Sequence, residues 1–359
     1  MSKRIQSLFI LSAIVWAWPV AGIGQPSQSA ETPQPRESEA PVEADDTLPD
    51  ISVEEAVRIA VEAVNAFDLM MDTESASAAF QKATRATDVL QRLDPVNPWL
   101  YYLRGRVYAI AGRGNEAVEQ LREFTRTRAG RNEWRGHRAL ADLFVEHYPR
   151  LAQASYESAY ELKRNEPTVL MGLSECAFAV GEIDKAVRFA TDAAEYDGHK
   201  SVRYEHHLAT MLAARRDWPG AQRMALRSLE IARDSVQVGK DAHLALEVVG
   251  AQYELLIDVL KKRVQQTPDD ARAHLDLAKY IREQSDHDVL MSQHEILKIL
   301  EAGVLSTAGR TPAELAVQYA VAMAKVGRTE EAVTHLEKIL SAEPNNAEAK
   351  EWLTRLRSE

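Results

Sequence analysis

Residues 101–124 read YYLRGRVYAIAGRGNEAVEQLREF. Apolar and small residues recur there at helical spacing on both sides of Gly112. Glycine readily takes the left-handed conformation that ends a helix, so Gly112 predicts a tight turn between two helices. The small residues Gly105 and Ala117 would let these two helices approach closely. One such pair cannot bury its own apolar face, so the stretch predicts a fold in which helix pairs stack on one another.

The same pattern returns at a nearly constant distance along the chain. Small residues early in the predicted second helix of each pair lie 34, 35, 34 and 35 residues apart, at Ala83, Ala117, Ala152, Ala186 and Ala221. Further copies read LMGLSECAFAVGEIDKAVRFATDAA at 170–194 and AVQYAVAMAKVGRTEEAVTHLEKILSAEPNN at 316–346. The counterparts of Gly105, Gly112 and Ala117 in these copies are Ser174, Gly181 and Ala186, and then Ala320, Gly327 and Ala332.

These residues follow a 34-residue pattern of the form W-x2-L-G-x2-Y, then A-x3-F, then Pro. On them, the chain resembles the tetratricopeptide repeat (TPR) family. The match in the last copy includes Tyr319, Ala320, Ala332, Leu336 and Pro344. The resemblance implies an all-α, right-handed superhelical solenoid of about seven to eight helix–turn–helix pairs, closed by a C-terminal capping helix.

The solenoid should occupy residues 51–359. We expect a degenerate helical pair at 51–94, clearer repeats at 98–235, degenerate repeats with an insertion at 236–311, a repeat at 313–346 and the capping helix at 347–357. The interval from Ala221 to Ala332 is 111 residues, which leaves room for two degenerate repeats and an insertion near 285–294. Residues 239–266 show no turn signal apart from Gly250, so the sequence leaves open whether they form one long helix or a pair.

The first 50 residues differ in composition from the rest. Lys3 and Arg4 precede an apolar core and then small residues, which are the features of a secretory signal peptide at 1–24. Residues 25–50 are rich in Pro, Glu, Ser and Ala and carry seven acids against Arg36, so we expect a disordered acidic linker. The chain should therefore be exported to the periplasm or the extracellular space, without stable membrane insertion after cleavage. The alternative is an uncleaved signal anchor that tethers it to the membrane.

The sequence shows no constellation of catalytic residues. It contains no glycine-rich phosphate loop, no G-x-S-x-G elbow and no H-E-x-x-H. We therefore predict no enzymatic activity, no catalytic residue, no metal site and no cofactor. The net charge of −11 argues against a nucleic-acid partner, because such proteins must neutralise phosphates with Lys and Arg. Cys176, the only cysteine, lies in an apolar helical stretch and is expected to be a buried thiol.

The TPR resemblance also implies a binding groove. In that family the first helix of each pair lines the concave face, where extended peptides or partner helices lie. Carried onto this chain, the lining would comprise Trp99, Tyr102, Arg106, Trp134, His137, Arg138, Phe144, Met171, Glu175, Phe178, Arg203, His206 and Thr210. Aromatic and arginine side chains contribute much of the binding energy at protein interfaces. The alternative for the aromatic residues is that they form the core between repeats.

A basic zone overlaps this region. Residues 99–140 hold nine Arg against four Glu, although the whole chain is acidic. The arginines gathered near one junction are Arg122, Arg126, Arg128, Arg131 and Arg135. Such a zone could dock an acidic peptide, a carboxylate-bearing polymer or the chain's own acidic tail, and the alternative is a solvated charged surface.

These observations favour a non-catalytic binding scaffold in the cell envelope that takes a peptide or protein partner. The second hypothesis is a structural subunit that self-associates into a larger envelope assembly, so a homo-oligomer is compatible with the sequence. An enzyme whose site is not visible in the sequence is a third hypothesis. The sequence leaves the identity of the partner and the oligomeric state open.

Overall fold

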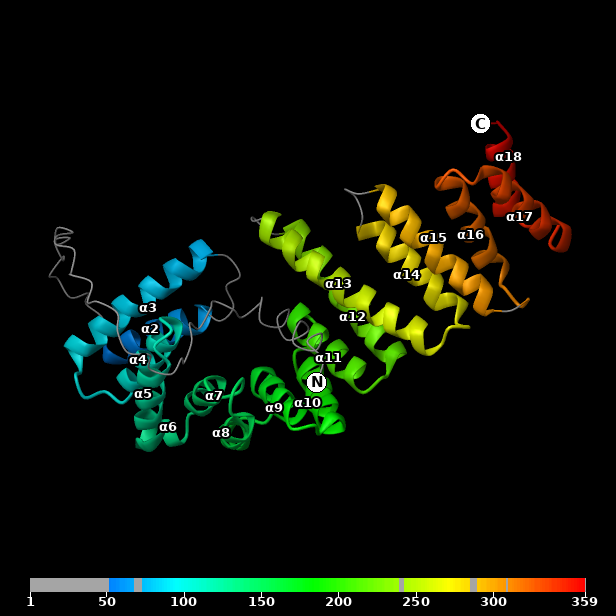
Figure 1. Cartoon of the computed structure of the whole chain (residues 1–359). Coiled ribbons are helices and arrows are strands. Elements are labelled where there is room, and N and C mark those ends of the chain that lie inside the picture. Colours follow the sequence, from blue (N-terminus) through cyan, green and yellow to red (C-terminus); the bar gives the residue numbers. More distant parts are fainter. Residues whose placement is uncertain (1–51, 68–72, 239–241, 285–288, 308, 359) are drawn as a thin grey trace, which may run out of the picture. The chain divides into compact units, whose positions relative to one another are not determined.

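The computed structural model describes residues 52–67, 73–238, 242–284, 289–307 and 309–358, and the described part contains helices and no strands (Figure 1). The predicted signal peptide and acidic linker lie outside these residues. The chain divides into two compact units, of which the first ends at Gly181 and the second begins at Glu182.

Unit 1 contains three packed helix pairs, α2/α3, α4/α5 and α7/α8, followed by α9. The four-residue helix α6 connects α5 to α7. The bounds are α2 Val53–Phe67, α3 Thr73–Leu93, α4 Trp99–Ile110, α5 Gly114–Arg126, α6 Arg128–Arg131, α7 Trp134–Asp142, α8 Pro149–Leu162 and α9 Pro167–Ala179. Pro149 and Pro167 stand at helix starts, where the missing N–H of proline leaves no helical hydrogen bond unmade.

Unit 2 starts with α10 and continues with the packed pairs α11/α12, α14/α15 and α16/α17. The last helix, α18, packs against α17 and α16. The bounds are α10 Ile183–Tyr196, α11 Val202–Ala214, α12 Trp218–Val238, α13 Ala242–Gln266, α14 Ala271–Gln284, α15 Val289–Ser306, α16 Ala313–Lys325, α17 Thr329–Ala342 and α18 Ala347–Ser358. The expected all-α fold of TPR-like helix–turn–helix repeats is therefore confirmed.

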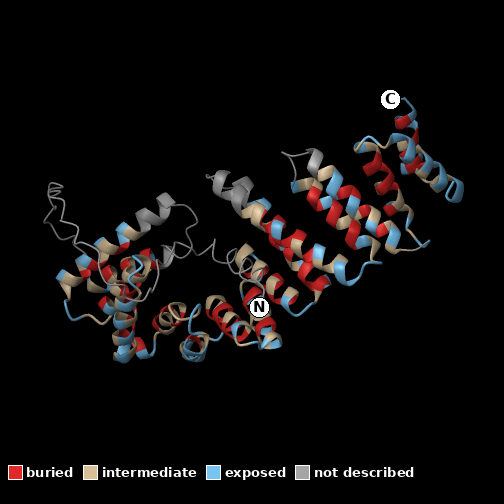
Figure 2. Ribbon diagram, in the orientation of Figure 1, coloured by how far each residue is buried: buried red, intermediate tan, exposed pale blue. Residues whose placement is uncertain are grey.

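The small residues of the repeat lie where the helices of a pair meet. The six alanines at the repeated position are all fully buried: Ala83, Ala117, Ala152, Ala186, Ala221 and Ala332. A methyl group added at Gly105 of α4 would lie 2.6 Å from Cγ of Leu121 in α5. Figure 2 shows the consequence, with buried residues on the faces between helices and exposed residues on the outer faces. The periodicity thus records helix contact.

The turns between paired helices also agree with the prediction. Gly112, Gly181 and Gly327 have φ values of +72°, +87° and +86°, a conformation that side chains with a Cβ rarely adopt. The turn between α11 and α12 has the same form without a glycine, because Arg216 takes a φ of +66° there. Gly112, Arg216 and Gly327 end the first helix of their pairs and reverse the chain, and Gly181 takes the same backbone conformation at the end of unit 1.

The region between the clear repeats differs from the expectation of two degenerate pairs. It contains α13, a single 25-residue helix that stands between two pairs, and then the pair α14/α15. Helix α13 packs on α12 and α14 along a continuous apolar face that includes Leu256 and Leu260, both fully buried. Whether residues 239–266 form one long helix or a pair is thereby answered for the residues from Ala242 onward, which form one helix.

The predicted insertion at 285–294 is corrected in part. Residues 285–288 lie outside the described residues, whereas Val289 begins α15. The second part of the predicted insertion is therefore helical, and it lengthens α15 to 18 residues. Apolar residues recur through that helix at a spacing that continues into the buried Ile296 and Leu300, which explains why the stretch extends the helix.

Candidate functional site

The described residues contain no group of three or more His, Cys, Asp and Glu side chains placed to hold a metal ion. Within the same residues, every helix is too short or too polar to cross a membrane. Cys176 is fully buried, as expected, and burial together with the carboxylates of Glu175 and Asp142 raises the pKa of its thiol to about 12. A thiol in this state is a core residue and a poor nucleophile.

The groove residues predicted in α4 belong largely to the core. Tyr102 is fully buried, and its ring lies 5.7 Å from that of Trp99 and 5.4 Å from that of Phe124. Arg106 is also buried, at 7% exposure. Tyr102 and Arg106 therefore do not line an open groove, because their face of α4 is covered by neighbouring helices. Trp99 is half-buried against the same Phe124 ring.

The predicted residues of α7 and the turn after it remain partly accessible. Trp134, the first residue of α7, is half-buried, with the Arg135 guanidinium 5.0 Å and the Lys163 ammonium 4.6 Å from its ring. His137 is also half-buried, with Nε2 3.4 Å from the backbone oxygen of Arg131. We call Trp134, Arg135 and Lys163 the Trp134 cluster. Cations placed over an aromatic face are attracted to its π electrons, so these two contacts stabilise the ring in its observed position.

Arg138 has a structural role in this part of unit 1. Its side chain is 12% exposed and pairs with Asp142, with Nε 3.1 Å from Oδ2. Asp142 also accepts a 2.6 Å hydrogen bond from the hydroxyl of Tyr156 in α8. Burial and the neighbouring carboxylates, Asp142 first, raise the pKa of Tyr156, so it stays a hydrogen-bond donor. Asp142 therefore connects α7 to α8, and the Arg138 side chain, which is paired with Asp142, offers little surface to a partner.

Phe144, just beyond α7, forms a second partly exposed aromatic site. The Arg122 guanidinium of α5 lies 5.8 Å from its ring, and the Tyr148 ring lies 6.4 Å away, edge-on. Tyr148 is 60% exposed, and Leu151 in the next turn is 47% exposed. We call Arg122, Phe144 and Tyr148 the Phe144 cluster. Sequence reasoning missed Tyr148 and Lys163, although the aromatic spacing from 144 to 148 and the basic pair at 163–164 were visible signals.

The remaining groove residues lie in α9 and α11. Met171 of α9 is buried at 7% exposure, so it too is corrected from groove to core, whereas Glu175 and Phe178 are half-buried. In unit 2, Arg203 and Thr210 are half-buried, and the Thr210 hydroxyl donates to the backbone oxygen of His206 in its own helix.

His206 contacts α13, which the sequence did not place there. Its Nδ1 lies 2.8 Å from Oε1 of Gln252 in α13, and the Ser228 hydroxyl of α12 donates to the same oxygen over 2.7 Å. Gln252 and Ser228 are buried at 3% and 0% exposure. Burial lowers the pKa of His206, which favours the neutral ring in this polar network. The long helix α13 thus covers the face of α11 that carries His206.

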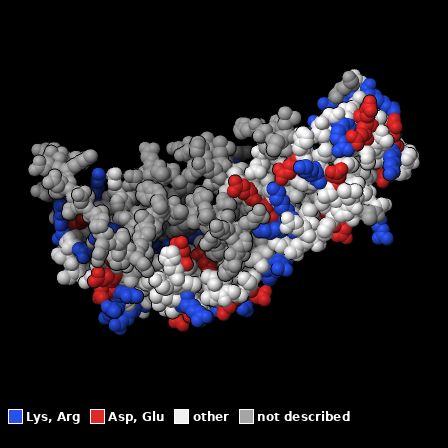
Figure 3. All heavy atoms as spheres, in the orientation of Figure 1, with Lys and Arg blue, Asp and Glu red and all other residues white. Residues whose placement is uncertain are grey.

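The five arginines of the basic zone lie at the junction of α5, α6 and α7. Arg122, Arg126, Arg128 and Arg131 are exposed, and Arg135 is half-buried. We call these five residues the basic surface. Figure 3 shows Lys and Arg side chains gathered where α6 lies, at the lower left of the molecule. Since Arg122 lies over Phe144 and Arg135 lies over Trp134, the basic surface is bordered by both aromatic clusters.

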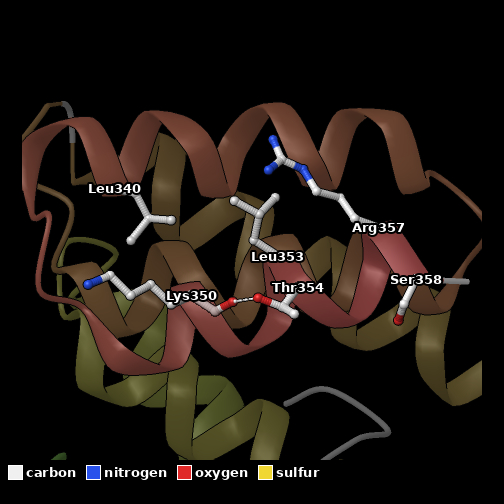
Figure 4. A pocket seen from close by; sticks show the side chains of 6 residues that line it. All are labelled: Leu340, Lys350, Leu353, Thr354, Arg357 and Ser358. Carbon is white, nitrogen blue, oxygen red and sulfur yellow. Dashed lines mark hydrogen bonds between the residues drawn. The ribbon is translucent and has the colours of Figure 1, made fainter.

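The C-terminal end of unit 2 carries a shallow hollow between α17 and α18 (Figure 4). Its volume is about 450 Å³, and it is lined by Leu340, Lys350, Leu353, Thr354, Arg357 and Ser358. Thr354 donates to the backbone oxygen of Lys350, and Arg357 pairs with Glu337. The Ser358 hydroxyl donates to the backbone oxygen of Arg355, so these three polar side chains are hydrogen-bonded within unit 2.

Known structures with related folds are TPR proteins. A thermophilic TPR protein of Thermus thermophilus is 17% identical over 56% of this chain and 98% of its own, with a TM-score of 0.42. The C-terminal part of a TPR repeat-containing protein of Cytophaga hutchinsonii is 12% identical over 82% and 98%, with a TM-score of 0.46. MamA of Desulfovibrio magneticus is 15% identical over 52% and 98%, with a TM-score of 0.39. No protein-family profile and no curated protein matches the sequence. The TPR-type fold of this chain rests on its own helix pairs, buried alanines and positive-φ glycines.

Proposed function

We propose that this chain is a non-catalytic, exported scaffold of the cell envelope that holds a peptide or protein partner on unit 1. The partner would lie on the basic surface between the Trp134 and Phe144 clusters. The observation that carries the proposal is the pair of partly exposed aromatic rings, each beside an arginine. Aromatic and arginine side chains dominate the energetics of protein interfaces, and a ring already held in position loses little entropy on binding.

Affinity capture from an envelope extract tests the partner site. The bait is the chain from residue 25, compared with a Trp134→Ala/Tyr148→Ala variant. The matched control is Tyr196→Ala/Leu305→Ala, which removes two apolar side chains of unit 2 that are 60% and 73% exposed. We expect one protein to be retained by the native chain and the control and lost by the variant. A Tyr148→Ala single variant guards against misfolding, because that side chain is mostly exposed. Equal retention by all baits would place the partner elsewhere and contradict the proposal.

Export has a separate test. The chain is expressed with its own N-terminus in a bacterial host, and the mass of the product is measured in the cytosolic and envelope fractions. We expect the envelope fraction to contain a product that begins near residue 25, since small residues precede this point. A full-length product in the membrane fraction would support the anchor alternative, and one confined to the cytosol would contradict export.

A further inference from the structure

We propose that residues 25–50 of the chain itself dock on the basic surface of unit 1 and compete there with the partner. This inference rests on the proposed function, because it assigns a regulator to the same site. It follows from the charges that the fold leaves uncommitted, from the composition of the segment and from where the segment joins unit 1.

The five arginines of the basic surface differ in what they already contact. Arg126 pairs with Glu123 at 2.5 Å, and Arg135 pairs with Glu133 at 2.9 Å. Arg122 lies over the Phe144 ring. Arg128 and Arg131, at the two ends of α6, are exposed and have no side-chain partner among the described residues. The surface therefore keeps at least two cations, Arg128 and Arg131, for an anionic ligand. Arg126 and Arg135 are already paired, the first in an exposed ion pair that contributes little to stability.

The segment has the complementary charge. Residues 25–50 carry seven acids and Arg36, which gives a net charge of −6. The stretch from 122 to 135 carries five Arg and two Glu, which gives +3. The acids of the segment are Glu31, Glu37, Glu39, Glu43, Asp45, Asp46 and Asp50. Because they are spread over about 20 residues, several of them could face separate arginines at the same time.

The connection to unit 1 makes the encounter intramolecular. The segment ends close to Val53, where α2 begins, and α2 packs on α3 and α4 of the same unit as the basic surface. An extended chain spans about 3.3 Å a residue, so the 26 residues of the segment reach up to about 85 Å. The basic surface lies on α5, α6 and α7, and α5 packs on α4, which packs on α2. Because packed helix axes lie about 8–10 Å apart, the segment is long enough to reach the basic surface from the start of α2.

Tethering is also what favours the segment over an unconnected acidic ligand. A flexible tether of this length gives an effective concentration in the millimolar range. Even a weak intrinsic affinity, with a Kd of about 10–100 µM, would leave the surface mostly occupied and would weaken an incoming acidic ligand by roughly tenfold to a hundredfold. The contact is electrostatic and exposed, so it should weaken as ionic strength rises.

A peptide competition experiment tests the inference. A fluorescein-labelled synthetic peptide of residues 25–50 is titrated with four forms of the chain from residue 25, and its anisotropy is measured. The first form is native. The second has a neutral segment, in which each of the seven acids is replaced by its amide. The third adds Arg128→Glu and Arg131→Glu to the neutral segment. The fourth, the matched control, adds Arg223→Glu and Lys298→Glu, which change two exposed cations of unit 2 that also lack a side-chain partner among the described residues.

We expect the peptide to bind the second and fourth forms at least tenfold more tightly than the native form, because the native segment competes. Binding to the third form should fall by about tenfold relative to the second. Equal affinity for the first two forms, no binding to the second form, or equal loss in the third and fourth forms would each overturn the inference. The capture experiment stands apart from this one. If a partner is retained but the peptide does not bind, the proposed function stands and the docking of the segment is refuted. If the peptide binds but no partner is retained, the docking of the segment stands and the proposed function is refuted.

Discussion

Replacing Gly105 by alanine tests whether the repeat depends on close contact between paired helices. Gly105 is the seventh residue of the 12-residue helix α4, and it faces α5. The new methyl group would lie 2.6 Å from Cγ and 2.9 Å from Cδ2 of Leu121, and 3.3 Å from the backbone oxygen of Ala117. Leu121 is fully buried, so its side chain has little room to move. The clash must therefore move α4 away from α5 or force Leu121 from its rotamer.

Two effects of opposite sign set the size of the change. Alanine in a helix interior is favoured over glycine by about 1 kcal/mol. Overpacking a filled core costs about 1–3 kcal/mol. Gly250 in α13 separates the two effects, because a methyl group there has no neighbour within 4 Å. Gly250→Ala should raise the free energy of unfolding of its region by up to about 1 kcal/mol. The change caused by Gly105→Ala in its own region should be less favourable than this by about 1–3 kcal/mol, because of the overpacking.

The assay must report on each region separately, because stacked repeats can unfold in parts. Amide hydrogen exchange in α4 and α5, and then in α13, gives the local free energy of opening for each variant. Leu121→Ala in the Gly105→Ala background provides a further check, since the double variant should cost less than the sum of the single ones. If Gly105→Ala stabilised its region as Gly250→Ala does, the close contact between α4 and α5 would be refuted.

Three other predictions follow from single groups. Cys176, whose thiol pKa is raised to about 12, should not react with a thiol reagent at pH 8 until urea unfolds the chain; rapid labelling of the native chain would contradict its burial. Burial lowers the pKa of His207 from 6.5 to about 3, so the unfolded chain binds more protons between these values, and the stability of unit 2 should be complete above pH 6.5 and fall as the pH drops towards 3. His207→Gln should reduce this pH dependence of the free energy of unfolding, measured by urea unfolding at several pH values. An unchanged pH profile would contradict the role of His207. Gly112→Ala has space for a methyl group but a φ of +72°, so it should destabilise unit 1 by about 1–2 kcal/mol, and a neutral result in thermal unfolding would mean that the turn can change its conformation.

The sequence determined the repeat unit because each unit is local. The contact of Gly105 with Leu121 and the turn glycines at 112 and 327 belong to single helix pairs, and the spacing of the alanines repeats with those pairs. Such contacts depend on residues about 10–20 positions apart, so a periodic pattern in a single chain is enough to reveal them. The burial of Cys176 was also predicted from a local feature, the apolar helical stretch that contains it.

The candidate site could be predicted only in part. The sequence indicated the basic surface and Trp134, which the structure leaves at least partly accessible. It assigned Tyr102, Arg106 and Met171 to the groove as well, because they occur on the first helices of their pairs. Their side chains are buried, and burial depends on which face of a helix its neighbours cover. The pairing of Arg138 with Asp142, which removes it from the accessible set, likewise required coordinates.

Other features depend on packing between residues far apart in the chain, so they required the three-dimensional structure. Residues 239–266 carry no turn signal apart from Gly250, and the sequence left open whether they form one helix or two. The structure shows one helix from Ala242, packed against α12 and α14. That helix contacts His206 through Gln252, which lies 46 positions further along the chain. The availability of Arg128 and Arg131 also depends on the fold, because a charged side chain is paired or available according to which residues the fold places beside it. Local spacing specifies a repeat, whereas the exposure and pairing of each side chain are properties of the assembled stack.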